Sequence, residues 1–210
     1  MIETIRNVIN PNVKVRHQDK QILFIEASDD AKLKKIIFNL TNFHTIGGGE
    51  LKNAIVVSSD HTSELLKQFS HFINPDCADI TRKCDYIIFH ANENRLNVIL
   101  CELKSSALGT TGRCPAQFEF SRKFASYIIE IAKTHGLFHL ENFRPDEITT
   151  TFYKIVFLPG PAIAQYPVGV DNIVKKTMKT ADDGVISIPL TVTSAGSCSI
   201  PWRHFLEALL

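Results

Sequence analysis

Two hydrophobic runs separated by a short polar turn constrain the fold of this chain more than any other feature. The first is Asp85-Tyr-Ile-Ile-Phe and the second is Asn97-Val-Ile-Leu-Cys-Glu-Leu-Lys104. Apolar runs of this length, bounded by polar residues, predict the two strands of a hairpin. Residues i and i+2 of a strand point to the same face, so Glu102 and Lys104 project together. The hairpin would carry Asp85 back alongside them.

Two acidic side chains and a lysine that meet at one point indicate metal-dependent chemistry on phosphate. Two converging carboxylates are typical ligands of a hard divalent cation such as Mg²⁺, and an adjacent ammonium group can orient water or neutralise phosphate charge. Asp85, Glu102 and Lys104 therefore predict hydrolysis of phosphodiester bonds. Blander interpretations remain open: Asp85 simply begins a strand, and Glu102 with Lys104 forms an exposed ion pair worth about 0–1 kcal/mol.

The arrangement resembles the PD-(D/E)xK nuclease superfamily, in which a metal-binding Asp lies on one strand and an acid-x-Lys triplet on the next. The resemblance covers roughly Asp60 to Leu158. It implies that Asp85 and Glu102 are metal ligands, that the carbonyl of Leu103 is a further ligand, and that Lys104 takes the role of the family's lysine.

The segment Pro115–Tyr127 resembles the helix that follows the triplet in this family. A Gln one turn into that helix faces the active site, and here this residue is Gln117. Arg113, Arg122 and Lys123 are candidates for a local basic patch that contacts nucleic acid, although cations on an amphipathic helix commonly just solvate its outer face.

One departure from the family pattern concerns the first acid, because Cys84 rather than Pro precedes Asp85. The literal Pro-Asp pair ends at Asp76, which leaves Asp76 and Asp79 as rival first ligands in a turn-like run. Asp85 is preferred because it opens a hydrophobic strand. Glu64, on the helix expected before Asp85, is either an additional acid or part of a polar helix face.

A second Glu-Leu-Lys triplet serves as an internal control for chance matches. Glu50-Leu51-Lys52 spells the same triplet directly after Gly47-Gly48-Gly49. No acid-led strand comes shortly before it and no Gln-bearing helix follows it, so this copy is expected to be a solvated turn.

Composition limits the class of protein. The 210 residues, 44% of them hydrophobic, predict one globular domain spanning 1–210. No membrane-spanning apolar run or secretory leader is apparent, so we expect a cytoplasmic protein without membrane association. Five cysteines without a Cys-x-x-Cys pair predict neither a zinc ribbon nor a disulfide framework. A formal net charge of +1 means that nucleic-acid binding must come from a local patch.

The hydrophobic pattern predicts an α/β fold with a mixed central β-sheet flanked by helices. Pro189 places the late strand at an edge, because proline donates no hydrogen bond. The expected elements are, in chain order, an N-terminal hairpin of 13–16 and 21–27, a helix from 28 to about 43, a strand at 54–57, a helix beginning at 60, the central hairpin, the Gln117 helix ending near His135 before Gly136, a strand at 149–158, a strand at 185–192 and a closing helix at 202–210.

We therefore expect a nuclease that depends on Mg²⁺ or Mn²⁺, with a restriction-endonuclease-like core and N- and C-terminal additions. DNA is favoured over RNA as the substrate. Family analogy implies a role in restriction, repair or anti-phage defence, with a separate ATPase or recognition subunit. Whether the chain forms a homo-oligomer stays open. So do two other classes, a non-catalytic nuclease-fold binding or scaffold protein and an unrelated enzyme that uses its histidines and cysteines.

Overall fold

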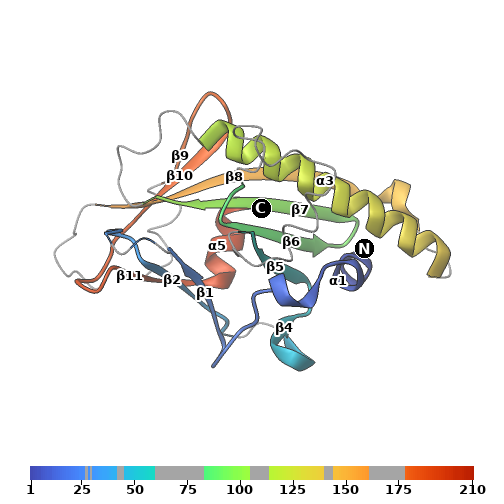
Figure 1. Cartoon of the computed structure of the whole chain (residues 1–210), viewed down its shortest axis with the longest axis horizontal. Helices are drawn as coiled ribbons and strands as arrows, with labels where there is room; N and C mark the ends of the chain where they lie inside the picture. The colour runs from blue at the N-terminus through green and yellow to red at the C-terminus, as the bar shows by residue number, and fades with distance from the viewer. Residues whose placement is uncertain are drawn as a thin grey trace. The chain divides into compact units, whose positions relative to one another are not determined.

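A computed structural model describes residues 1–26, 28, 30–41, 45–59, 83–104, 114–139, 144–160 and 178–210. They form a mixed α/β fold that divides into two compact units (Figure 1). The first unit comprises Met1–Lys14, Asn53–Leu100 and Gly112–Phe152, and the second comprises Val15–Lys52, Cys101–Thr111 and Tyr153–Leu210. Strands β7 (Arg95–Leu103) and β8 (Thr149–Pro159) continue from one unit into the other, so no single point in the sequence separates the units.

The first unit is built on strands in the order β5-β6-β7-β8. Strands β5 and β6 pair antiparallel, with Ala54 opposite His90 and Ser58 opposite Tyr86. Helix α3 runs along β6 and β7 (Figure 1), and α1 packs against α3. The elements are α1 (Ile2–Val8), the 3-10 turn Pro11–Val13, β5 (Ala54–Ser58), β6 (Tyr86–Asn92), the first part of β7 (Arg95–Leu103), α3 (Cys114–His139), the 3-10 turn Pro145–Glu147 and the first part of β8 (Thr149–Pro159).

The central hairpin is buried along nearly its whole length. Tyr86 to His90 of β6 and Leu96 to Leu103 of β7 are all buried. Strands covered on both faces read as continuous apolar runs, which is why this hairpin is prominent in the sequence. Thr149 N–H donates to the carbonyl of Asn94 at 2.9 Å, so β8 begins beside the start of β7.

The second unit contains strands in the order β7-β8-β10-β9 and a separate sheet β1-β2-β11. Strand β10 runs parallel to β8 and antiparallel to β9, while β2 pairs antiparallel with β1 and parallel with β11. The elements are β1 (Gln21–Ile25), β2 (Lys35–Asn39), β3 (Thr45–Ile46), the 3-10 turn Gly47–Gly49, β4 (Glu50–Leu51), β7 to Leu103, β8 to Pro159, β9 (Lys179–Thr180), β10 (Val185–Leu190), β11 (Ser197–Pro201) and α5 (Trp202–Leu209).

An aromatic cluster forms the core of the second unit. Phe38 of β2 lies 4.9 Å from Phe24, 5.1 Å from Phe205 and 5.4 Å from Trp202, measured between ring centroids. Phe157 of β8 lies 5.8 Å from Phe205. All five rings are fully buried, and each removes about 150–250 Å² from water. The cluster thereby joins β1, β2, β8 and α5.

Several expected elements are confirmed, including the mixed central sheet. The strands expected at 54–57 and 149–158 are β5 and β8, and the closing helix is α5. Among helices in the described part of the chain, none combines the length and the apolarity needed to cross a bilayer. The helix expected from 60 lies outside the described residues.

The helix expected from 28 to about 43 is wrong, because Lys35–Asn39 forms strand β2. Burial alternates along this segment, with Ile36 and Phe38 fully buried and their neighbours partly exposed. A short apolar run fits both helical and strand spacing, and here pairing on both sides of β2 decides the outcome.

The expected N-terminal hairpin is also wrong. Strand β1 pairs with β2, and of 13–16 only Lys14 forms an isolated bridge, to Val57. Helix α3 does not end before Gly136 but includes it and continues to His139. Gly136 is buried there, so packing outweighs the roughly 1 kcal/mol that glycine costs inside a helix.

Two smaller expectations differ from the structure. Strand β10 is not the last strand of its sheet, but β9 pairs only with Ile186 and Ser187. Pro189 lies beyond that pairing, so its missing N–H interrupts no hydrogen bond to β9. Glu50 and Leu51 are not in a solvated turn, because they form β4 and Leu51 is buried.

Candidate functional site

The backbone that leads into Asp85 is held by hydrogen bonds within the first unit. The N–H of Cys84 donates to Oγ of Ser121 at 2.8 Å. The carbonyl of Cys84 accepts a hydrogen bond from the hydroxyl of Ser59. The N–H of Ser59 donates to the carbonyl of Asp85 at 2.9 Å. Two buried serines, one after β5 and one on α3, thus fix the peptide next to the candidate acid.

One face of α3 meets the same segment at three successive positions. Gln117 Nε2 donates to the carbonyl of Lys83 at 3.2 Å, Ser121 follows one turn later, and the ring of Phe124 lies 5.6 Å from Nζ of Lys83. Positions i, i+4 and i+7 share a helix face. Burial lowers the pKa of Lys83, because desolvation disfavours the ammonium form.

The acid-x-Lys triplet lies at the end of β7 in the second unit. Lys104 Nζ donates to Oε1 of Glu102 at 2.5 Å, which shows that the two side chains share a face. The N–H of Lys104 donates to the carbonyl of Phe157 at 3.0 Å, so β8 supports the end of the strand. Leu103 points into packing and is buried.

The interpretation of Glu102 and Lys104 as an exposed ion pair is wrong. Their side chains are only 4% and 17% exposed, respectively. Moving two charges out of water costs several kcal/mol for each ion. A buried ion pair is therefore weak evidence that the pair stabilises the fold.

The structure therefore groups the candidate residues into two sets. In the first unit, Gln117 contacts the segment that leads into Asp85, and in the second unit Glu102 contacts Lys104. The remaining candidates, Glu64, Asp76, Asp79 and Arg113, lie outside the described residues.

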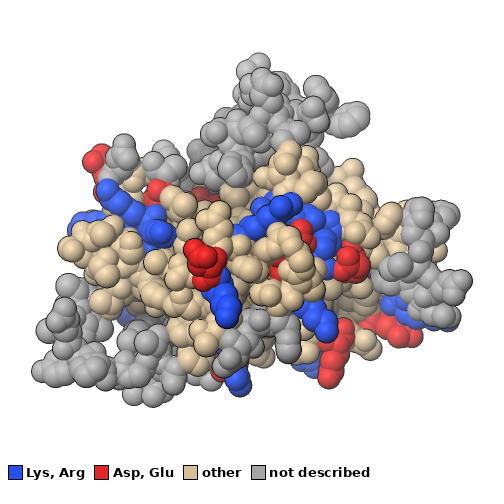
Figure 2. All heavy atoms as spheres, turned by 90° about the horizontal axis from the view of Figure 1, so that it is seen from below, with Lys and Arg blue, Asp and Glu red and all other residues tan. Residues whose placement is uncertain are grey.

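Arg122 is already engaged by a neighbouring acid. Its Nε and a terminal nitrogen donate to the two carboxylate oxygens of Glu119 at 3.1 and 2.7 Å. This pairing raises the pKa of Arg122 through the hydrogen bond and the charge of Glu119. Lys123 is exposed. On the face drawn in Figure 2, acidic side chains lie among the basic ones. Contact of Arg122 and Lys123 with nucleic acid stays a prediction.

The candidate donors suit a hard cation in their chemistry. Asp85 and Glu102 offer carboxylate oxygens and Leu103 offers a carbonyl, and Mg²⁺ and Mn²⁺ prefer oxygen ligands. Within the described ranges, no three His, Cys, Asp or Glu side chains gather to hold a metal ion. The candidate set has two such side chains and one backbone oxygen, so it would not form a group of that kind.

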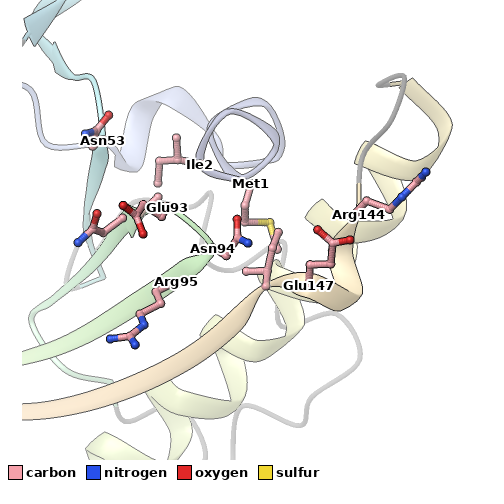
Figure 3. A pocket seen from close by; sticks show the side chains of 11 residues that line it. Met1, Ile2, Asn53, Glu93, Asn94, Arg95, Arg144 and Glu147 are labelled. Atoms are coloured by element: carbon pink, nitrogen blue, oxygen red, sulfur yellow. The ribbon is translucent and has the colours of Figure 1, made fainter.

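A pocket of about 450 Å³ lies at the turn between β6 and β7 (Figure 3). Glu93, Asn94 and Arg95 contribute to it from the turn, and Arg144 and Glu147 from the segment before β8. The guanidinium groups of Arg95 and Arg144 point in opposite directions (Figure 3), so they do not converge on one anion. This pocket is at the other end of β6 from Asp85.

Three residues around Asp85 are not indicated by the sequence pattern, namely Lys83, Ser59 and Ser121. The spacing of Gln117, Ser121 and Phe124 predicts that the three side chains share one face of a helix. The sequence does not predict which backbone segment that face contacts. Comparison with protein-family models, with curated proteins and with solved structures finds no match to this chain.

Proposed function

We propose that this chain is a nuclease, dependent on Mg²⁺ or Mn²⁺, that hydrolyses phosphodiester bonds of nucleic acid, with DNA favoured over RNA. The observation that carries the proposal is the buried Glu102, bonded to Lys104 at the end of β7. This strand directly follows the one that Asp85 opens, and the backbone before Asp85 is held by Ser121.

The turn of the central hairpin supports convergence of the two acids. Only Glu93 and Asn94 separate β6 from β7. In a two-residue hairpin the flanking residues, here Asn92 and Arg95, lie opposite each other, and pairing proceeds one residue at a time from them. We propose that this register continues to the end of the hairpin, where it sets Asp85 opposite Glu102.

In the proposed mechanism the two carboxylates and the carbonyl of Leu103 would hold a divalent metal ion. Such an ion would supply positive charge that polarises the scissile phosphate and lowers the pKa of the attacking water. Lys104 holds Glu102 in place and positions the water or stabilises the negative charge that develops on the phosphate. Gln117 keeps the strand that carries Asp85 in position through the carbonyl of Lys83.

The wider assignment rests on family resemblance. We propose a restriction-endonuclease-like core and a cytoplasmic role in restriction, repair or anti-phage defence. In such a role the nuclease acts with a separate ATPase or recognition subunit. A nuclease fold that only binds nucleic acid is the alternative, and the assay below separates the two.

A cleavage assay with matched variants tests the proposal. Purified protein is incubated with labelled single- and double-stranded DNA and RNA, with Mg²⁺, with Mn²⁺ or with a chelator. We expect cleavage that requires metal, is lost in Glu102→Gln and is kept in Glu50→Gln, which alters the other Glu-Leu-Lys triplet. Binding without cleavage would favour the scaffold alternative. Equal cleavage by wild type and Glu102→Gln would contradict the proposed site.

A further inference from the structure

Lys83 and Asp85 flank one buried residue in the segment that leads into β6. Cys84 between them is fully buried, whereas Lys83 and Asp85 are both partly exposed. The ammonium group of Lys83 is therefore carried only two residues before the candidate metal ligand Asp85.

The side chain of Lys83 packs against an aromatic ring of α3. Its Nζ lies 5.6 Å from the centroid of the Phe124 ring, a cation-π contact, and its carbonyl accepts the hydrogen bond from Gln117. In the described part of the chain no Asp or Glu forms an ion pair with Lys83. A cation that lies over an aromatic face keeps its charge and can still bind an anion.

Arg122 offers a contrast on the same helix. Two of its nitrogens donate to Glu119, so its charge is compensated locally. Among the described residues, the cation near Asp85 that forms no ion pair with an acid is thus Lys83, not the arginine that the sequence makes conspicuous.

We propose that Lys83 binds a phosphate group of the nucleic-acid backbone beside Asp85, with Phe124 and Gln117 holding it in position. This inference rests on the proposed function, because a nucleic-acid substrate supplies the phosphate. Each neutralised phosphate releases condensed counterions, so the salt dependence of binding reports the contact directly.

The test measures binding of a fluorescent duplex DNA by anisotropy over a series of salt concentrations, with a chelator present so that no cleavage occurs. Lys83→Gln is expected to weaken binding and to reduce the slope of log K against log salt by about 0.9, the value for one phosphate contact. Lys83→Arg, which keeps the charge, is expected to retain the slope. Arg95→Gln is the matched control, because Arg95 is an exposed cation at the far end of the hairpin.

The outcomes separate this inference from the proposed function. A slope that is the same in Lys83→Gln and wild type overturns the inference, even if the wild type cleaves DNA. A Lys83-dependent slope in a protein that never cleaves supports the inference and contradicts the nuclease. Absence of any duplex binding by the wild type overturns the inference, whereas the cleavage assay decides the proposed function separately. Circular dichroism of each variant confirms folding, and an unfolded Lys83→Gln leaves Lys83→Met to be compared with Lys83→Arg by the same criterion.

Discussion

Oγ of Ser121 accepts a hydrogen bond from the N–H of Cys84, with 2.8 Å between oxygen and nitrogen, and this bond connects helix α3 to the backbone that leads into Asp85. Both residues are fully buried. Ser121→Ala removes the acceptor of a buried N–H, so we expect the free energy of unfolding to fall by about 1–3 kcal/mol. Urea denaturation measures this change.

The control for Ser121 is another hydroxyl on the same helix. Thr134 donates to the carbonyl of Glu130 and is exposed. Thr134→Ala is expected to change stability by less than about 0.5 kcal/mol, as surface substitutions usually do. Equal effects of the two substitutions would mean that the Cys84 hydrogen bond does not hold this segment.

The buried pair of Glu102 and Lys104 predicts strong coupling between the two residues. Lys104→Met leaves the Glu102 charge without its ammonium partner and should cost about 3 kcal/mol, whereas replacing both residues by apolar ones is often close to neutral. A double-mutant cycle with Glu102→Leu measures the coupling from denaturant midpoints. Additive effects of the two substitutions would show that the pair is not coupled in solution.

We expect the free energy of unfolding to depend on pH through His90. It is buried on β6, and burial lowers its pKa from the usual 6.5, because desolvation disfavours the imidazolium. Below that value the unfolded chain takes up a proton that the folded chain does not. The contribution of His90 is therefore full above about pH 6.5 and declines as the pH falls further.

The variant His90→Gln removes this titration. We expect the free energy of unfolding, measured from about pH 5 to about pH 7.5, to decline less steeply on acidification in the variant than in the wild type. Parallel curves for the two proteins would mean that His90 titrates alike in the folded and unfolded states.

Lys104 is expected to act on the chemical step. Lys104→Ala should lower the single-turnover cleavage rate by orders of magnitude with little change in substrate affinity. Lys104→Arg should not restore the rate, because the guanidinium is bulkier and stays protonated. Lys52→Ala, in the other Glu-Leu-Lys triplet, is the control. A loss of affinity at unchanged rate in Lys104→Ala would contradict a catalytic role.

The parts of the fold that the sequence predicts well are those in which burial is continuous. The apolar run from Tyr86 to Phe89 lies in a strand because both faces are covered, and Trp202 begins a helix with an apolar stripe. Segment 35–39 forms a strand rather than the expected helix. Its apolar residues fit either period, and the choice depends on pairing with β1 and β11. Pairing between segments far apart in the chain leaves no local signal.

The candidate site shows the same limit. The shared face of Glu102 and Lys104 follows from strand geometry alone, so it was predictable. The burial of the pair cannot be predicted in this way, since it depends on which residues pack around the end of β7. The contacts of Ser121 and Lys83 likewise require knowledge of which helix face meets the segment before Asp85.

The proposed function requires that Asp85 and Glu102 bind a metal ion together. Titration with Mn²⁺, followed by electron paramagnetic resonance of the free ion, measures the number of bound ions and their affinity. The account predicts one or two ions in the wild type, with loss of binding at this site in both Asp85→Asn and Glu102→Gln and no further loss in the double variant. Mn²⁺ binding that is unchanged in either single variant would contradict it.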